Sequence, residues 1–223
     1  MKRKILFLTG LIVSLCAVMA VVDGVFQANY IIKSSIKLVL FLGAPFLYGR
    51  FTKGFILKNL FVPQKKGLIV SLLLGAGVYT VILGGYLLLK DVFDFSAITG
   101  TLTNGIGVNK GNFVFVALYI SFINSLLEEF FFRGFAFLTL KNMVSRKTAY
   151  IFSAFVFSAY HVAMMVGWFS LPLFILILTG LFAGGLIFNF LNEKSGTIYP
   201  SWLVHMFANF AINTVGFILF GII

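Results

Sequence analysis

The 223-residue chain has very few cysteines, histidines and charged residues. It contains one cysteine, Cys16, two histidines and six acidic residues, and only 10% of its residues are charged. A single cysteine excludes an intramolecular disulfide and any metal site built from several thiolates. The hydrophobic share is 61% and the mean hydropathy is +1.07. A water-soluble domain of this composition would expose far too much apolar surface, so the composition excludes that class.

Long apolar runs recur along the whole chain, which predicts an all-α, polytopic integral membrane helix bundle of about seven transmembrane helices, with six or eight as alternatives. The seven segments are 5–22, 34–49, 67–89, 112–140, 148–168, 171–191 and 198–221. The second segment is short and carries Pro45, so we expect a kink or a tilt. The fourth is too long for a simple span, and we expect it to project beyond the membrane. We interpret 90–111 as an outside loop.

The first apolar run resembles a signal sequence at its start, because basic residues precede it. However, 5–22 is long for the apolar part of a signal, and no clear A-x-A cleavage site precedes Asp23. The bulky Leu15 before Cys16 also argues against a lipoprotein site. We therefore expect a retained anchor helix.

The net charge of +11 comes from basic residues that cluster between the apolar runs. This pattern is a topology signal and not a nucleic-acid patch, so we expect no nucleic-acid partner. If the N-terminus is inside, the inside segments carry Lys2, Arg3, Lys4, Arg50, Lys53, Lys58, Lys65, Lys66, Lys141, Arg146, Lys147 and Lys194. The outside segments carry only Lys33, Lys37, Lys90 and Lys110. The excess predicts an N-terminus inside and a C-terminus outside.

Scarce ionisable residues are concentrated inside the predicted spans. Four of the six acidic residues fall in loops, but Glu128 and Glu129 lie in the fourth apolar segment, within SLLEEFFFRG. Both histidines, His161 and His205, also fall inside spans. A charge at mid-bilayer costs about 2.5–3.5 kcal/mol on insertion scales, so such residues are usually functional or tightly paired.

Helix geometry separates the two glutamates. Glu129 and Arg133 are four residues apart and share a helix face, so they can form an ion pair. Glu128 lies about 140° around the helix from Arg133, at about 100° per residue. We therefore expect Glu128 to be the carboxylate without a local cation, in apolar surroundings suited to a general base.

The two histidines each have a partner at helical spacing. FSAYH places Phe157 and His161 on one face of the fifth segment, and HMFAN places His205 and Asn209 on one face of the last. Each feature alone has a structural explanation: an intramembrane histidine can simply bond two helices, and Phe157 is one of 29 phenylalanines. The conjunction of a carboxylate, two histidines and an amide on the three spans that carry such polar residues, the fourth, the fifth and the last, favours one shared site.

Three motifs in order resemble those of a known family. EEFFFR matches E-E-x-x-x-R, FSAYH matches F-x-x-x-H and HMFAN matches H-x-x-x-N. This combination resembles the CPBP group, the CAAX prenyl endopeptidases and bacteriocin-processing relatives also called the Abi family. The motifs predict a core of four helices in 111–223. Residues 1–110 would form about three N-terminal helices, about which the resemblance says little.

The resemblance implies an intramembrane endopeptidase acting on a membrane-associated peptide or a lipidated protein. Glu128 would be the base that activates water, and His161 would orient the water and shuttle protons. His205 and Asn209 would stabilise the tetrahedral oxyanion. The remaining motif residues would support the site structurally, namely Glu129, Arg133 and Phe157.

We expect no cofactor, with zinc as an alternative. Glu128, His161 and His205 could form a His₂Glu zinc site with an open water position. The H-E-x-x-H motif is absent, however, and the three ligands would have to converge from three helices. We therefore favour the glutamate mechanism.

Two further functions compete with proteolysis. Relatives of this family are linked to bacteriocin self-immunity, so a non-catalytic immunity or regulatory membrane protein is the main alternative. A proton-coupled transporter using Glu128 is less favoured, because no inverted repeat is visible. The short chain resembles compact bacterial members, which implies the bacterial cytoplasmic membrane. Membrane lipid is an expected partner, and the sequence does not indicate an oligomeric state.

Overall fold

The computed structural model describes residues 1–52, 57–62 and 67–223. In these ranges the regular elements are helices, with no strand. Seven helical runs are long and apolar enough to cross a membrane. The predicted fold class, an all-α polytopic membrane helix bundle, is confirmed.

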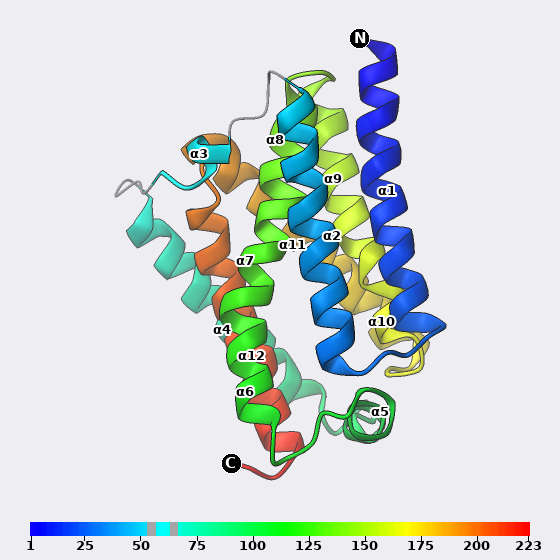
Figure 1. Cartoon of the computed structure of the whole chain (residues 1–223). Coiled ribbons are helices and arrows are strands. Elements are labelled where there is room, and N and C mark those ends of the chain that lie inside the picture. The colour runs from blue at the N-terminus through cyan, green and yellow to red at the C-terminus, as the bar shows by residue number, and fades with distance from the viewer. Residues whose placement is uncertain (53–56, 63–66) are drawn as a thin grey trace.

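The seven spans follow one another along the chain, with two short helices between them (Figure 1). The spans are α1 (Lys2–Gly24), α2 (Tyr30–Phe51), α4 (Leu68–Leu89), a composite fourth span (Phe113–Lys141), a fifth (Arg146–Met165), α11 (Leu171–Ser195) and α12 (Tyr199–Leu219). The short helices are α3 (Leu57–Leu60) and α5 (Ser96–Ile106). Every predicted boundary lies within four residues of the observed one.

The segment 90–111 is not simply a loop, because it contains α5. The Asp94 carboxylate accepts the Ser96 backbone N–H at 2.8 Å near the start of the helix. The helix ends at Gly107, whose φ of 75° is a left-handed conformation that glycine adopts readily. With 11 residues α5 is too short to span a bilayer, so the odd number of spans is unaffected.

Two spans are interrupted, and both interruptions concern motif residues. The fourth span consists of α6 (Phe113–Leu118), the π-helical η1 (Tyr119–Asn124), α7 (Ser125–Glu128), the π-helical η2 (Glu129–Phe137) and α8 (Leu138–Lys141). The fifth consists of α9 (Arg146–Tyr160) and α10 (Val162–Met165), with His161 at the junction. Wide π turns inside helices often mark functional sites. At its α6 end the fourth span extends past α2 towards α5 and the C-terminus (Figure 1).

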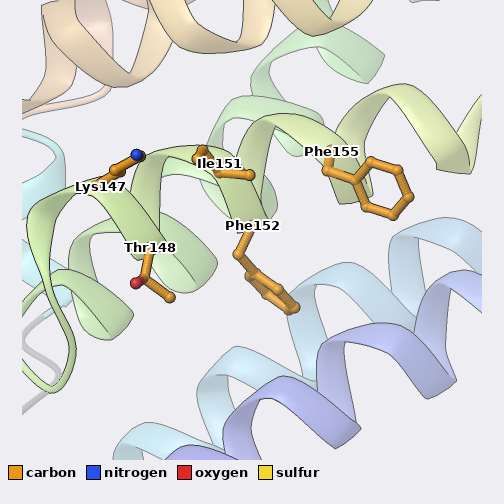
Figure 2. Close-up of a pocket in the computed structure, with 5 residues that line it drawn as sticks. All are labelled: Lys147, Thr148, Ile151, Phe152 and Phe155. Carbon is orange, nitrogen blue, oxygen red and sulfur yellow. The ribbon is translucent and has the colours of Figure 1, made fainter.

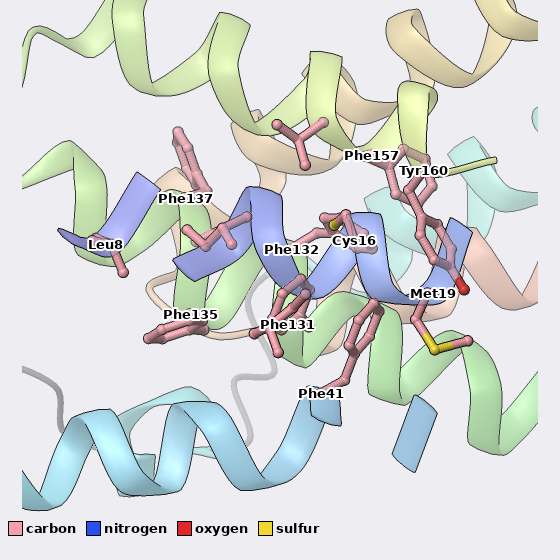
Figure 3. Close-up of a cluster of buried hydrophobic side chains, with 14 of the residues drawn as sticks. Leu8, Cys16, Met19, Phe41, Phe131, Phe132, Phe135, Phe137, Phe157 and Tyr160 are labelled. Atoms are coloured by element: carbon pink, nitrogen blue, oxygen red, sulfur yellow. The ribbon is translucent and has the colours of Figure 1, made fainter. Parts of the chain in front are cut away.

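A buried aromatic cluster joins the N-terminal helices to the motif-bearing ones (Figure 3). Phe41 of α2 stacks on Phe131 of η2, with ring centroids 3.9 Å apart. Phe132 meets Phe157 of α9 edge to face at 5.3 Å. Lipid tails are as apolar as these rings, so the association depends on close packing and not on exclusion of water. The cluster fixes α1 and α2 against the segment that carries both glutamates.

The opposite side of the fourth span is covered by α12, which packs closely on α4. At the contact, a Cβ atom added to Gly75 of α4 would lie 2.6 Å from Cδ2 of Phe207. Only glycine allows this approach between the two helices.

The two ends of the chain lie at opposite ends of the bundle (Figure 1), as an odd number of spans requires. Lys37 must be removed from the predicted outside set, because it lies within α2 and is 6% exposed. Lys53, Lys65 and Lys66, which were assigned to the inside, lie outside the described residues. The sidedness of the termini therefore stays a prediction.

A surface hollow of about 420 Å³ lies along α9 (Figure 2). It is lined by Lys147, Thr148, Ile151, Phe152 and Phe155. None of the predicted site residues lines it, so the hollow is separate from the candidate site.

Candidate active site

Glu128 lies at the end of α7, between the two π-helical segments, and is 3% exposed. One carboxylate oxygen, Oε1, accepts a hydrogen bond from the Lys37 ammonium of α2. The same oxygen accepts the side-chain N–H of Asn124 at 3.1 Å. Lys37 also donates to Oδ1 of Asn124 at 2.6 Å, which closes a three-residue network.

Glu128 has no cation on its own helix, as expected, but Lys37 of α2 supplies one. That expectation considered only the helix of Glu128 itself, and Lys37 comes from a span 91 residues earlier in the chain. Glu128 is therefore not an isolated carboxylate, and isolation cannot be what makes it a base. The ion pair instead stabilises a charged carboxylate in apolar surroundings.

The other carboxylate oxygen of Glu128, Oε2, faces both histidines. Nε2 of His161 lies 4.0 Å from it, and Nε2 of His205 lies 3.7 Å from it. His161 comes from the α9–α10 junction and His205 from α12. The structure thus brings together the three residues that the motifs placed on three different spans.

The hydrogen bonds of the histidines define which ring nitrogen faces Glu128. Nδ1 of His161 lies 2.7 Å from the carbonyl oxygen of Phe157, and Nδ1 of His205 lies 2.8 Å from Oε1 of Glu129. Both of these oxygens can only accept, so each Nδ1 carries the proton. In the neutral rings each Nε2 is then an acceptor directed at another acceptor. A proton donor such as water belongs between them.

Glu129 pairs with Arg133 as predicted, with 3.4 Å between Oε1 and Nη1 and both side chains fully buried. The guanidinium also lies over the ring of Phe157, at 4.0 Å from the centroid. Phe157 in turn meets His161 edge-on at 4.8 Å and His205 at 6.0 Å. This phenylalanine therefore supports the guanidinium and both imidazoles at once. Glu129 does more than the predicted clamp, because it also binds His205.

Asn209 lies one turn beyond His205 on α12 and is 7% exposed. Its side-chain N–H donates to the carbonyl oxygen of Ile120 at 3.1 Å. The wide turn of η1 also directs the backbone N–H of Ser125 to this carbonyl. Asn209 is thus fixed to the fourth span by this bond, one turn beyond His205.

A polar face of α12 aligns it with the fourth span. Trp202 donates its indole N–H to Oγ of Ser125 at 3.0 Å. Asn213 donates to Oγ of Ser121 at 3.0 Å. Together with the bonds of His205 to Glu129 and of Asn209 to Ile120, these contacts recur every three or four residues along α12, which is the spacing of one helix face. They hold His205 in register with Glu128.

The described residues contain no group of three His, Cys, Asp or Glu side chains arranged to hold a metal ion. The two imidazoles have the oxygen-bound Nδ1–H groups that zinc ligands often show. However, Glu128 is already paired with the ammonium of Lys37, so a dication bound by Oε2 would meet a second positive charge on the same carboxylate. As arranged, the residues do not fit zinc, and no step is derived through it.

The sequence-based prediction missed Lys37 and Asn124. Lys37 lies inside the second predicted segment, where an ionisable residue is a signal of function or pairing, but it was counted with the outside lysines. Asn124 precedes Glu128 by four residues, the spacing at which helical side chains meet.

The fold and these buried groups define a helical membrane protein with a carboxylate–histidine site. Residues 110–211 match a family model described as "Type II CAAX prenyl endopeptidase Rce1-like". Over this segment, which contains all three motifs, the chain is similar to the Rce1-like family of CAAX prenyl endopeptidases, as the CPBP resemblance predicted. Comparisons with curated proteins and with solved structures gave no match. The matched segment does not include α1, α2 or α4.

Proposed function

We propose that this protein is an intramembrane endopeptidase that hydrolyses a peptide bond in a membrane-associated peptide or a lipidated protein. The observation that carries the proposal is the arrangement of Glu128, whose buried Oε2 faces the Nε2 atoms of His161 and His205 at 4.0 and 3.7 Å. The match to a family of prenyl endopeptidases supports the reaction class and a lipidated substrate.

The separations at the site suit one activated water. Distances of 3.7 and 4.0 Å are too long for direct hydrogen bonds, but a water at about 2.8 Å from both atoms can bridge them. In the proposed reaction this water gives one proton to Oε2 of Glu128 and donates its other hydrogen to His161. The water oxygen bonds to the scissile carbonyl carbon, and the carbonyl oxygen becomes an oxyanion.

The tetrahedral intermediate then collapses. His205 and Asn209 are the proposed donors to the oxyanion. Asn209 can donate because its amide has a second N–H beside the one bound to Ile120. His205 would donate from Nε2 when doubly protonated, while its Nδ1–H stays on Glu129. The proton on Glu128 passes, with the help of His161, to the leaving nitrogen. The C–N bond breaks, and a carboxylic acid and an amine result.

We also propose that the N-terminus lies on the cytoplasmic side of a bacterial membrane and the C-terminus outside. The charges of Lys2, Arg3 and Lys4 at the start of α1, and of Arg50 at the end of α2, support this orientation. In a Cys16→Ser background, a cysteine introduced at Lys2 should resist a membrane-impermeant maleimide in intact cells. Labelling there, with protection of a cysteine introduced at Gly221, would reverse the orientation.

The test of the enzyme is cleavage of a farnesylated CAAX peptide by the purified protein in lipid nanodiscs, followed by mass spectrometry. We expect Glu128→Gln to abolish cleavage, and the control Glu193→Gln, which alters a carboxylate outside the site, to retain it. An active Glu128→Gln variant would exclude the glutamate mechanism. Loss of activity with a chelator and its return with zinc would favour the metal alternative.

The non-catalytic alternative predicts a different result for Glu128→Gln. If Glu128→Gln inserts normally and supports the cellular phenotype as well as wild type, an immunity or regulatory function replaces the protease. A non-prenylated version of the same peptide separates recognition of the lipid from recognition of the sequence.

A further inference from the structure

The ammonium of Lys37 is buried in the candidate site and comes from a helix outside the family-matched segment. The residue is 6% exposed and lies in α2, two turns from its start. Its Nζ lies 5.7 Å from the ring centroid of Phe41 and 5.1 Å from that of Tyr160. Two aromatic faces and two hydrogen-bond acceptors therefore surround the cation, and fix it in place.

The bonds of Lys37 decide which carboxylate oxygen of Glu128 faces the histidines. Oε1 receives both the Lys37 ammonium and the Asn124 amide. Oε2 is then the oxygen directed at His161 and His205. Without Lys37, only the bond from Asn124 would hold Oε1 away from the water position.

Lys37 also balances the charge of the site. Two buried glutamates stand side by side, and Arg133 is the cation of Glu129. Lys37 is the cation of Glu128. A carboxylate buried without a partner in apolar surroundings takes up a proton instead of staying charged. A protonated Glu128 could not accept a proton from water.

We propose that Lys37 is a positioning residue for peptide hydrolysis, which holds Glu128 by Oε1 in its charged form with Oε2 towards the water position. The N-terminal helix α2 thereby completes a site whose other members all lie in the family-matched segment. This inference rests on the proposed function, because it assigns Lys37 a role only if Glu128 acts as the base.

The chain offers a matched control on the same helix. Lys33 lies one turn before Lys37 and pairs with Asp23 of α1 at 3.3 Å. Its side chain is 11% exposed, compared with 8% for Lys37. The two lysines thus share helix, depth of burial and an acidic partner, but only Lys37 contacts Glu128.

The experiment measures kcat and KM for the farnesylated CAAX peptide in nanodiscs. Lys37→Met should lower kcat by about 10- to 100-fold, the effect typical of losing a residue that holds a catalytic group in place, and should leave KM nearly unchanged. Lys37→Arg should recover part of kcat because it restores a charged donor. The kcat of Lys37→Ala should rise when ethylammonium is added. The control Lys33→Met should have the wild-type kcat with no added amine.

Each contrary result has a distinct meaning. Wild-type kcat in Lys37→Met would overturn the inference while Glu128→Gln stays inactive. Loss of kcat that neither Lys37→Arg nor ethylammonium restores would reduce Lys37 to a structural residue. If Lys37→Met does not fold, the response of Lys37→Ala to the amine decides. An active Glu128→Gln variant would overturn the proposed function itself.

Discussion

The ion pair between Lys37 and Glu128 predicts a strong energetic coupling that can be measured without a substrate. Both side chains are at most 8% exposed, so neither charge can be solvated if its partner is lost. Removing one member of such a pair costs about 3–5 kcal/mol, because the other charge is left buried and uncompensated. Replacing both members by neutral groups of similar size is close to neutral.

The perturbation is a double-mutant cycle of Lys37→Met and Glu128→Gln, measured by thermal unfolding in nanodiscs. At about 2–4 °C per kcal/mol for a chain of this size, each single variant should lose about 6–20 °C in Tm. The double variant should recover most of that loss. The exposed pair of Arg146 and Glu193, with side chains 64% and 15% exposed, is the comparison. It should show a coupling of about 0–1 kcal/mol.

The result that would refute this reasoning is additivity. If the double variant loses as much as the sum of the two singles, the two groups do not stabilise each other, and the network around Oε1 has no energetic consequence. A destabilised Glu128→Gln beside an unaffected Lys37→Met would instead show that Glu128 does not depend on Lys37 for its stability.

Two further predictions concern the packing around the site. Phe157→Leu should lower the free energy of unfolding by about 2 kcal/mol, from the lost contact with Arg133 alone, and should lower kcat. The control Phe155→Leu, at a 62% exposed position two residues away, should change neither the Tm nor the kcat. Gly75→Ala should cost about 1–3 kcal/mol in thermal unfolding because its Cβ would meet Phe207, and Phe207→Leu should relieve that cost; an unchanged Tm in Gly75→Ala would mean that α4 and α12 can separate without penalty.

The positions of the seven spans could be predicted from the sequence, because each span is a continuous apolar run bounded by charged residues. The same holds for the pair of Glu129 and Arg133, whose spacing of four residues sets their distance on any helix. Helix α5 was missed because glycine and threonine in 90–111 favour a loop by composition. Its start is supported by one bond, which the Ser96 backbone N–H donates to the Asp94 carboxylate, and it ends at one glycine.

The pairing of Lys37 with Glu128 could not be predicted in this way, and the reason is physical. Their distance is set by how α2 packs on the fourth span, where Phe41 stacks on Phe131, and on α9, where Phe41 lies tilted against Tyr160. No periodicity within either helix encodes that contact. What the sequence did contain was an unbalanced charge, since Arg133 could neutralise only one of two adjacent glutamates. A second cation inside another span could balance this charge, and Lys37, three residues into the second predicted segment, was such a residue.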